Sequence, residues 1–219
     1  MAVYDAGPPV ASRKESLWLA CKQKTCCYTP FVIPSGYDVW RIARILQTPP
    51  WSFLMYFQTP QPRRDAFALD ASGRYFRLAL AKGRPQRKGA PPPCIFLLRT
   101  RNGHHRCGLG DLRPLVCRAF PAELVDGVLC LLPDSGCTCR TWALADIDIV
   151  EETALVEARQ AHSEEYCALV ARWNDQVMAA PDGAGRTFMD FCIFVVEAYD
   201  RLAEACLLYT SPSPRDRQK

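Results

Sequence analysis

The sequence predicts an α+β protein with a small, irregular, metal-stapled core of short β-hairpins and short helices, followed by a C-terminal helical hairpin. Three observations predict this class. Nine of the twelve cysteines lie in three groups between residues 21 and 139. Short apolar runs bounded by Gly, Pro and Asn-Gly turns connect these groups. Beyond residue 144 the apolar residues recur at helical spacing instead.

Composition divides the 219 residues into four parts. We expect a loose N-terminal arm over residues 1–15 and a cysteine-cluster metal-binding domain over 16–143. A helical hairpin over 144–206 is expected to pack on this domain. The last part, 207–219, is rich in Ser, Pro and Arg and resembles translated sequencing-adapter sequence, which would make it a disordered tail of non-native origin.

Capping and breaking residues define the first elements. A short helix is expected over 16–20, just before the first cysteines, and an extended run over 28–33. Ser35 can cap a helix that continues to about Gln47, because Asp38 follows three residues later as a capping box requires.

Downstream, apolar runs alternate with turn residues, which predicts short paired strands. Asn102-Gly103 is the strongest turn signal, because both residues tolerate positive φ. The expected elements are a short helix over 50–57, a hairpin of 67–69 with 75–80, a strand over 94–100 that returns to Cys107, and a hairpin over 124–132.

Two long helices are expected at the C-terminal end, over 146–179 and 187–206, separated by a Pro- and Gly-containing break. Each has an apolar stripe, so we expect the two to pack antiparallel. Carboxylate pairs such as Glu151-Glu152 fall on the first of these helices and are expected to be solvated. The stripes are Leu155, Ala158, His162, Tyr166, Leu169, Trp173 and Val177 on the first helix, and Phe188, Phe191, Cys192, Val195, Tyr199, Leu202 and Cys206 on the second.

The chain has no signature of a membrane or secreted protein. No apolar run reaches the roughly 18 residues that a membrane span requires. The N-terminus lacks a basic region followed by an apolar one, so we expect a cytoplasmic protein. In a reducing compartment, clustered cysteines bind metal or do redox chemistry more often than they form disulfides.

Charge is unevenly distributed along the chain, whose net charge is +4. The basic region over 74–106 holds nine Lys and Arg and no Asp or Glu. Such a region could meet nucleic acid or an acidic peptide. Solvated loops, or loops that face the acidic C-terminal helices, are favoured, because no aromatic-interleaved or helix-turn-helix pattern accompanies the charge. A nucleic-acid partner is therefore not expected, and an unidentified protein partner stays open.

The cysteine groups are typical of metal binding. Thiolates bind zinc tetrahedrally and also hold iron–sulfur clusters. Nine candidates exceed the four that one zinc takes, so a cluster, two metals or additional packing cysteines remain open. We expect the groups to converge in space, the first of them with Cys107 and Cys117. The candidate ligands are Cys21, Cys26, Cys27, Cys94, Cys107, Cys117, Cys130, Cys137 and Cys139.

Several segments between residues 21 and 140 form a pattern: the first cysteine group, the helix opening at Gly36-Tyr-Asp, Cys94-Ile-Phe-Leu, Cys107, Arg113-Pro114, Cys117-Arg118 and Phe120-Pro121. This pattern resembles the YkgJ-type cysteine-cluster family. That family is described as a zinc- or iron-chelating domain related to the cysteine-rich part of flagellin lysine methylases. The resemblance implies that six cysteines chelate metal, namely Cys21, Cys26, Cys27, Cys94, Cys107 and Cys117.

This sequence departs from the family pattern in two ways. Four residues separate Cys21 from Cys26, where the family has shorter steps and one more cysteine. The chain also adds Cys130, Cys137 and Cys139, which could replace that ligand.

Other reactive residue types are expected in supporting roles. Cys167, Cys192 and Cys206 fall in helices, and core packing is favoured for them over metal binding. His162 is expected in the core, and His104 and His105 in an exposed hairpin. Arg113 and Arg118 are expected to bind backbone carbonyls or Asp111, with donation to sulfur or to an anion as the alternative. No catalytic motif is present, so catalytic residues are not assigned.

Three functional hypotheses follow. The first is a metal-binding cysteine-cluster protein, with an iron–sulfur cluster such as [4Fe–4S] favoured over zinc, that acts in metal handling, in redox sensing or as a structural part of a larger system. The second is a protein-modifying enzyme similar to the flagellin lysine methylases. The third is a nucleic-acid-binding module that uses the basic region over 74–106.

Overall fold

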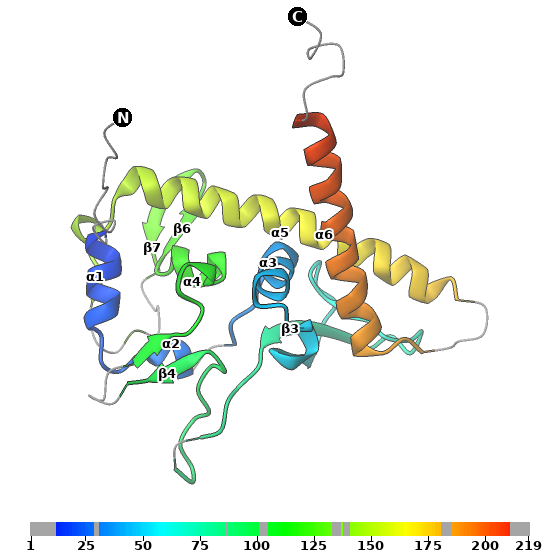
Figure 1. Cartoon of the computed structure of the whole chain (residues 1–219), viewed down its shortest axis with the longest axis horizontal. Helices are drawn as coiled ribbons and strands as arrows, with labels where there is room; N and C mark the ends of the chain where they lie inside the picture. Colours follow the sequence, from blue (N-terminus) through cyan, green and yellow to red (C-terminus); the bar gives the residue numbers. More distant parts are fainter. Residues whose placement is uncertain are drawn as a thin grey trace, which may run out of the picture.

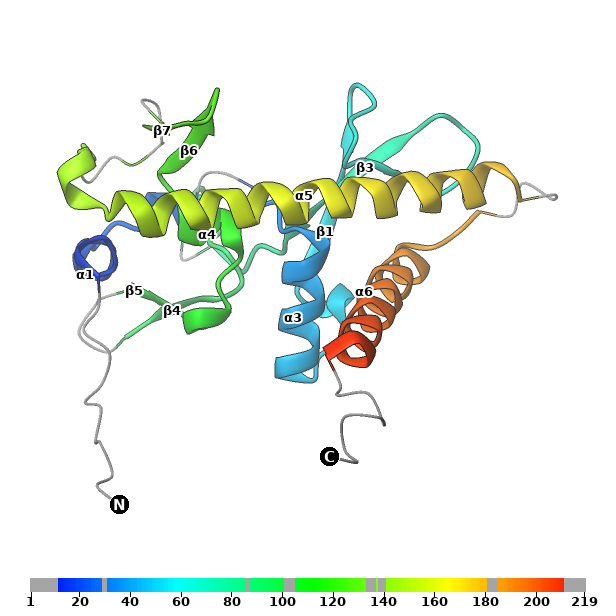
Figure 2. The same ribbon diagram turned by 90° about the horizontal axis from the view of Figure 1, so that it is seen from above.

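The structure is a computed structural model that describes residues 12–28, 31–85, 87–100, 105–132, 137, 141–180 and 185–210, the last five of these as backbone only. The protein combines helices with small antiparallel sheets, which confirms the α+β class. The longest described helix, α5 (Ile149–Met178), runs along the longest axis (Figures 1 and 2). α1, α4 and one hairpin lie along its N-terminal half, while α3, α6 and the three-stranded sheet lie along its C-terminal half. No described helix is long and apolar enough to cross a membrane.

Local capping defines the first helices. α1 (Arg13–Ala20) begins earlier than expected, because the Ser12 side chain accepts the backbone N–H of Glu15. α3 (Gly36–Leu46) has the expected capping box between Ser35 and Asp38, and this prediction is confirmed. α2 (Thr25–Tyr28) is a short helix where the extended run was expected to begin.

The expected second helix over 50–57 is wrong. Only Pro50–Ser52 is helical, as the 3-10 turn η1, and the chain then forms strand β1 (Leu54–Thr59). β1 pairs along its whole length with β3 (Tyr75–Leu80), which also pairs with β2 (Phe67–Ala68) as the expected hairpin. Phe53 and Leu54 are buried in the core, so pairing and burial together override the local helical pattern.

Two further hairpins agree with the sequence. β4 (Leu97–Arg99) pairs with β5 (His105–Cys107), although the predicted turn at residues 102–103 lies outside the described residues. β6 (Ala122–Val125) pairs with β7 (Val128–Leu131) across Asp126-Gly127, both of which have positive φ. This is the backbone that a two-residue hairpin turn requires.

Short helical elements connect these hairpins to the long helices. The 3-10 turn η2 (Gly110–Leu112) follows β5, and Arg113 and Pro114 connect it to α4 (Leu115–Ala119). A third 3-10 turn, η3 (Leu144–Asp146), precedes α5.

The predicted antiparallel packing of the two C-terminal helices is wrong. α6 (Phe188–Thr210) crosses α5 steeply and lies beside α3 (Figures 1 and 2). The reason is at Gly36, where an added Cβ would lie 2.5 Å from the Tyr199 ring of α6 and 2.8 Å from the Tyr166 ring of α5. Because glycine has no side chain, the start of α3 can lie against both α5 and α6, and all three helices contribute to one core.

α6 also ends later than expected, at Thr210 rather than Cys206, so four residues of the predicted tail are helical. Phe191, Cys192 and Val195 of the predicted stripe are buried, whereas Leu202 is 39% exposed. The remaining tail and the first eleven residues lie outside the described residues.

Candidate metal centre

Five of the nine candidate cysteines line a single cavity of about 260 Å³. They come from four parts of the chain: helix α2, the segment before β4, the end of β5, and helix α4. Cys26 and Cys27 of the first group therefore converge with Cys107 and Cys117 as expected, whereas Cys21, Cys130 and Cys137 are not among the lining residues. The remaining lining is mainly aromatic and aliphatic, with Arg113 as the charged residue among the described lining residues. The cysteines are Cys26, Cys27, Cys94, Cys107 and Cys117, and all five are free thiols.

Adjacent Cys26 and Cys27 both reach the cavity because they lie in a helical turn rather than in an extended strand. Lys24 precedes them with a positive φ of 48°, and its backbone N–H donates to the Cys21 sulfur at 3.4 Å. The carbonyl of Cys27 in turn accepts the backbone N–H of Cys94 at 2.7 Å. The first cysteine group is thus tied directly to the second.

The β4–β5 hairpin positions the next two sulfurs. Cys94 precedes β4, and Cys107 ends β5 opposite Leu97. The backbone N–H of Phe96 donates to the Cys94 sulfur, and those of Leu109 and Gly110 donate to the Cys107 sulfur. Backbone donors directed at sulfur favour the thiolate over the thiol.

Burial favours the protonated thiol rather than the thiolate. It is the main cause that raises the pKa of Cys94, Cys107 and Cys117, and neighbouring cysteine sulfurs raise these values further. In Cys26 and Cys27 a mutual hydrogen bond dominates. It lowers the pKa of Cys26 to about 7 and raises that of Cys27, because Cys27 acts as the donor.

Cations and an indole ring stand beside the thiols. The Lys24 ammonium, buried completely, lies 3.9 Å from the centre of the Trp18 ring and donates to the Trp18 carbonyl. The Arg113 guanidinium lies 4.3 Å from the same ring and pairs with Glu15 at 2.5 Å. Lys24 and the Trp18 side chain both help to lower the pKa of Cys26. Sequence reasoning missed Trp18 and Lys24, since their contacts depend on how α1 folds over the cavity.

The other candidate cysteines are not among the cavity residues. Cys21, the first member of the first group, is the C-cap residue of α1, and Cys130 lies on β7 opposite Glu123. Cys137 is partly buried, and Cys139 lies outside the described residues. Within the described part of the chain, no three Cys, His, Asp or Glu side chains form a ready-made site for one metal ion.

The helical cysteines and the histidines lie apart from the cavity lining. Cys192 is buried in the core, Cys167 is partly buried on α5, and the side chain of Cys206 is not described. His162 stacks on Tyr37 with ring centres 4.0 Å apart and lies 3.3 Å from Glu165, but its side chain is 31% exposed, so it lies at the edge of the core rather than inside it as expected. His105 lies within hydrogen-bonding distance of the Lys22 carbonyl and the Tyr28 hydroxyl, and His104 lies outside the described residues.

The basic region is partly neutralised by its surroundings. Arg77 pairs with Asp65, and Arg74 pairs with Asp70. Lys82 donates to the carbonyl of Tyr28. These contacts favour the interpretation of the region as solvated or internally paired charge.

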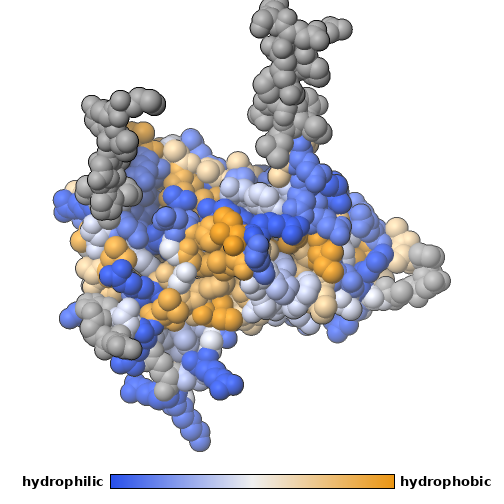
Figure 3. Space-filling model, viewed as in Figure 1, coloured by the Kyte–Doolittle hydropathy of each residue, from blue (hydrophilic) through white to orange (hydrophobic). Residues whose placement is uncertain are grey.

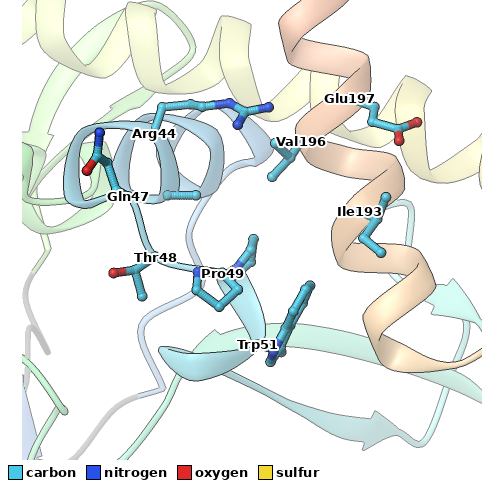
Figure 4. A pocket seen from close by; sticks show the side chains of 10 residues that line it. Arg44, Gln47, Thr48, Pro49, Trp51, Ile193, Val196 and Glu197 are labelled. Atoms are coloured by element: carbon cyan, nitrogen blue, oxygen red, sulfur yellow. The ribbon is translucent and has the colours of Figure 1, made fainter.

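A larger cavity, about 680 Å³, lies between the end of α3, η1 and α6 (Figure 4). Arg44, Trp51 and Glu197 line it, and its described lining contains no thiol or imidazole. The face in Figure 3 shows hydrophobic patches beside hydrophilic bands, and α3 ends with Ile45 and Leu46 exposed. This cavity has no donor set for a soft metal, so the cysteine cavity is the candidate centre.

No protein-family model, curated protein or solved structure matches the chain. The resemblance to the YkgJ-type family therefore stays a prediction.

Proposed function

We propose that this protein binds a metal centre through the thiolates of the cysteine cavity, with an iron–sulfur cluster favoured over zinc. One observation carries the proposal: five thiols from four separate parts of the chain line the same apolar cavity. Thiolates are the ligands of iron–sulfur clusters and of structural zinc. Cysteines that act only as small core residues are expected to pack against other side chains rather than to line one cavity together.

The environment of the sulfurs supports thiolate ligation. The thiol pKa values of Cys94, Cys107 and Cys117 are raised chiefly by burial, so without metal these groups hold their protons. A bound metal would replace those protons and neutralise much of the charge of the thiolates in a lining that is mainly apolar. The backbone N–H groups directed at Cys94 and Cys107 are already arranged to stabilise the charged form.

The size of the cavity favours a cluster. One zinc ion draws four sulfurs to about 2.3 Å from a single point. The cavity of about 260 Å³ and its five thiols offer more space and more ligands than one such ion uses. A [4Fe–4S] cluster takes four thiolates over a wider cage and would leave one thiol of the set over. Lys24 and Arg113 would balance part of its negative charge.

The elements around the cavity support a structural role for the metal. α2 contains no buried residue, and neither do the strands β4 and β5, the described parts of their hairpin. Such short elements gain little from apolar burial, while ordering them costs on the order of 1–2 kcal/mol per residue. Metal binding that is coupled to folding would offset this cost. Redox sensing or metal handling would use the same centre.

Paired cysteine variants test the proposal. Cys117→Ser removes a thiol from the cavity, and Cys130→Ser removes a partly buried thiol that does not line it. After anaerobic purification we expect Cys117→Ser to lose most of its metal and Cys130→Ser to retain the wild-type content. Equal metal content in all three proteins would refute the cavity as the site.

A further inference from the structure

We infer that Asp38 and Arg41, neighbours on one face of α3, are positioning residues that fix where the Cys117 thiol stands in the cysteine cavity. The inference rests on the proposed metal centre, because it concerns how one of its thiols is held. Neither side chain lines the cysteine cavity itself. Both act on the turn that leads into α4, the helix that contains Cys117.

The start of α4 has no cap of its own. The residue at its N-cap position is Pro114, and no side chain there accepts a hydrogen bond from the first turn. The first N–H groups of a helix need partners, most of all when they are buried. Asp38 provides one from 77 positions away: its Oδ1 atom accepts the buried N–H of Leu115 at 3.0 Å.

Arg41 holds the other side of the same turn. Its Nη2 atom donates to the carbonyl of Arg113 at 3.0 Å and to that of Leu112 at 3.4 Å. The same nitrogen lies 3.5 Å from Asp38 Oδ1. The Asp38 carboxylate and the Arg41 guanidinium therefore hydrogen-bond to the backbone on both sides of Pro114.

Asp38 is itself held in place. Its Oδ2 atom accepts the backbone N–H of Ser35 at 3.1 Å and the hydroxyl of Ser35 at 2.9 Å. The side chain is 1% exposed, so water cannot replace these partners. One carboxylate oxygen thus caps α3, and the other caps α4. The two roles can be tested separately. Removing the Ser35 hydroxyl directly affects only Oδ2, the oxygen that caps α3, and leaves the contact of Oδ1 with α4 in place.

Cys117 follows Leu115 by two residues, within the same turn of a helix only five residues long. A helix this short cannot keep its direction without its end contacts. Partners that orient metal ligands without touching the metal typically change metal affinity by about 10- to 100-fold when removed. We therefore expect loss of the Asp38 contact to weaken metal retention while all cysteines stay present.

The test compares Asp38→Asn and Arg41→Gln with two controls. Arg44→Gln alters the next arginine of α3, which pairs with Asp200 and does not touch the α4 turn. Ser35→Ala weakens the α3 cap and removes one of the two contacts to Asp38 Oδ2, while the contact between Asp38 Oδ1 and Leu115 stays. We expect the first two variants to lose metal to a chelator about 10- to 100-fold faster than wild type, Ser35→Ala to show a clearly smaller effect, and Arg44→Gln to behave as wild type.

A second measurement does not depend on metal. In metal-free protein, alkylation of each cysteine is followed by mass spectrometry, with Cys192 in the core as the reporter of global unfolding. We expect the Cys117 rate to change in Asp38→Asn and Arg41→Gln while the Cys192 rate stays at the wild-type value. Unchanged Cys117 reactivity, a parallel rise at Cys192, or an equal effect of Ser35→Ala would overturn the inference. A wild-type protein that takes up neither iron nor zinc would instead refute the proposed function.

Discussion

Lys14 and Glu152 form an ion pair that joins α1 to α5. We expect that removing one partner lowers the free energy of unfolding far more than removing both. The Nζ and Oε2 atoms lie 2.5 Å apart, and the side chains are only 11% and 6% exposed. Lys14 also donates to the carbonyl of Arg118 at the end of α4. The pair therefore anchors α1, which contributes Trp18 to the cysteine cavity.

The size of the expected loss in unfolding free energy follows from the burial of both charges. Burial is the main cause that lowers the pKa of Lys14 and raises that of Glu152, so desolvation outweighs the attraction within the pair. Removing one partner leaves the other charge buried and uncompensated, which costs about 3–5 kcal/mol. Replacing both by apolar residues of similar volume removes that penalty. We therefore expect Glu152→Leu to destabilise strongly and Lys14→Met with Glu152→Leu to lie within about 1 kcal/mol of wild type.

Urea unfolding of wild type, both single variants and the double variant measures this cycle. The comparison is made on metal-free protein, so that the unfolding free energies do not include metal binding. Arg64→Leu, which removes an exposed partner of Glu164, is the matched control and should change stability by less than about 1 kcal/mol. Additive single effects in the double variant would show that the two charges do not compensate each other, and the reasoning would be wrong.

Three further predictions concern the core and the metal centre. Cys192→Ala should leave bound metal unchanged and lower the unfolding free energy by about 1 kcal/mol, and loss of metal from this variant would make Cys192 part of the site. Gly36→Ala should destabilise by about 1–3 kcal/mol in urea, because its Cβ would lie 2.5 Å from the Tyr199 ring; wild-type stability would contradict the wedge of α3 between the long helices. Metal uptake should release protons, because the raised thiol pKa values keep these groups protonated in the metal-free protein. The affinity for metal should therefore fall with decreasing pH, and a pH-independent affinity in a titration with zinc would argue against thiol ligation.

Local signals in the sequence predicted the elements that depend on nearby residues. Ser35 and Asp38 form the capping box that their spacing indicates. Asp126-Gly127 forms the hairpin turn that its tolerance of positive φ allows. In both cases the decisive contacts span three residues or fewer, so no knowledge of the tertiary structure is needed.

Elements that depend on distant partners were not predictable in the same way. Residues 54–59 form a strand because β3 pairs with them, whereas their local pattern also fits a helix. Glu152 was expected to be solvated but is buried, because Lys14 reaches it from the other end of the chain. The steep crossing of α5 and α6 depends on the close approach at Gly36, which no periodicity in either helix encodes.

The candidate site was predictable in its residue types but not in its membership. The clustering of cysteines indicated thiolate chemistry, and five of the nine candidates do line one cavity. The sequence could not separate these from Cys21 or Cys130, because which thiols line one cavity depends on contacts between distant parts of the chain. Asp38 was noted only as part of a helix cap, since its contact with Leu115 crosses 77 positions.

The most direct test of the metal centre is the iron, zinc and acid-labile sulfide content of the full chain purified without oxygen. An iron–sulfur cluster in the cysteine cavity predicts iron and sulfide in equal molar amounts, each in a fixed ratio to protein, with the visible absorbance of sulfide-to-iron charge transfer. Stoichiometric zinc without sulfide would keep the thiolate site and reject the cluster. A protein that contains neither metal, and takes up neither on anaerobic reconstitution, would contradict the central claim.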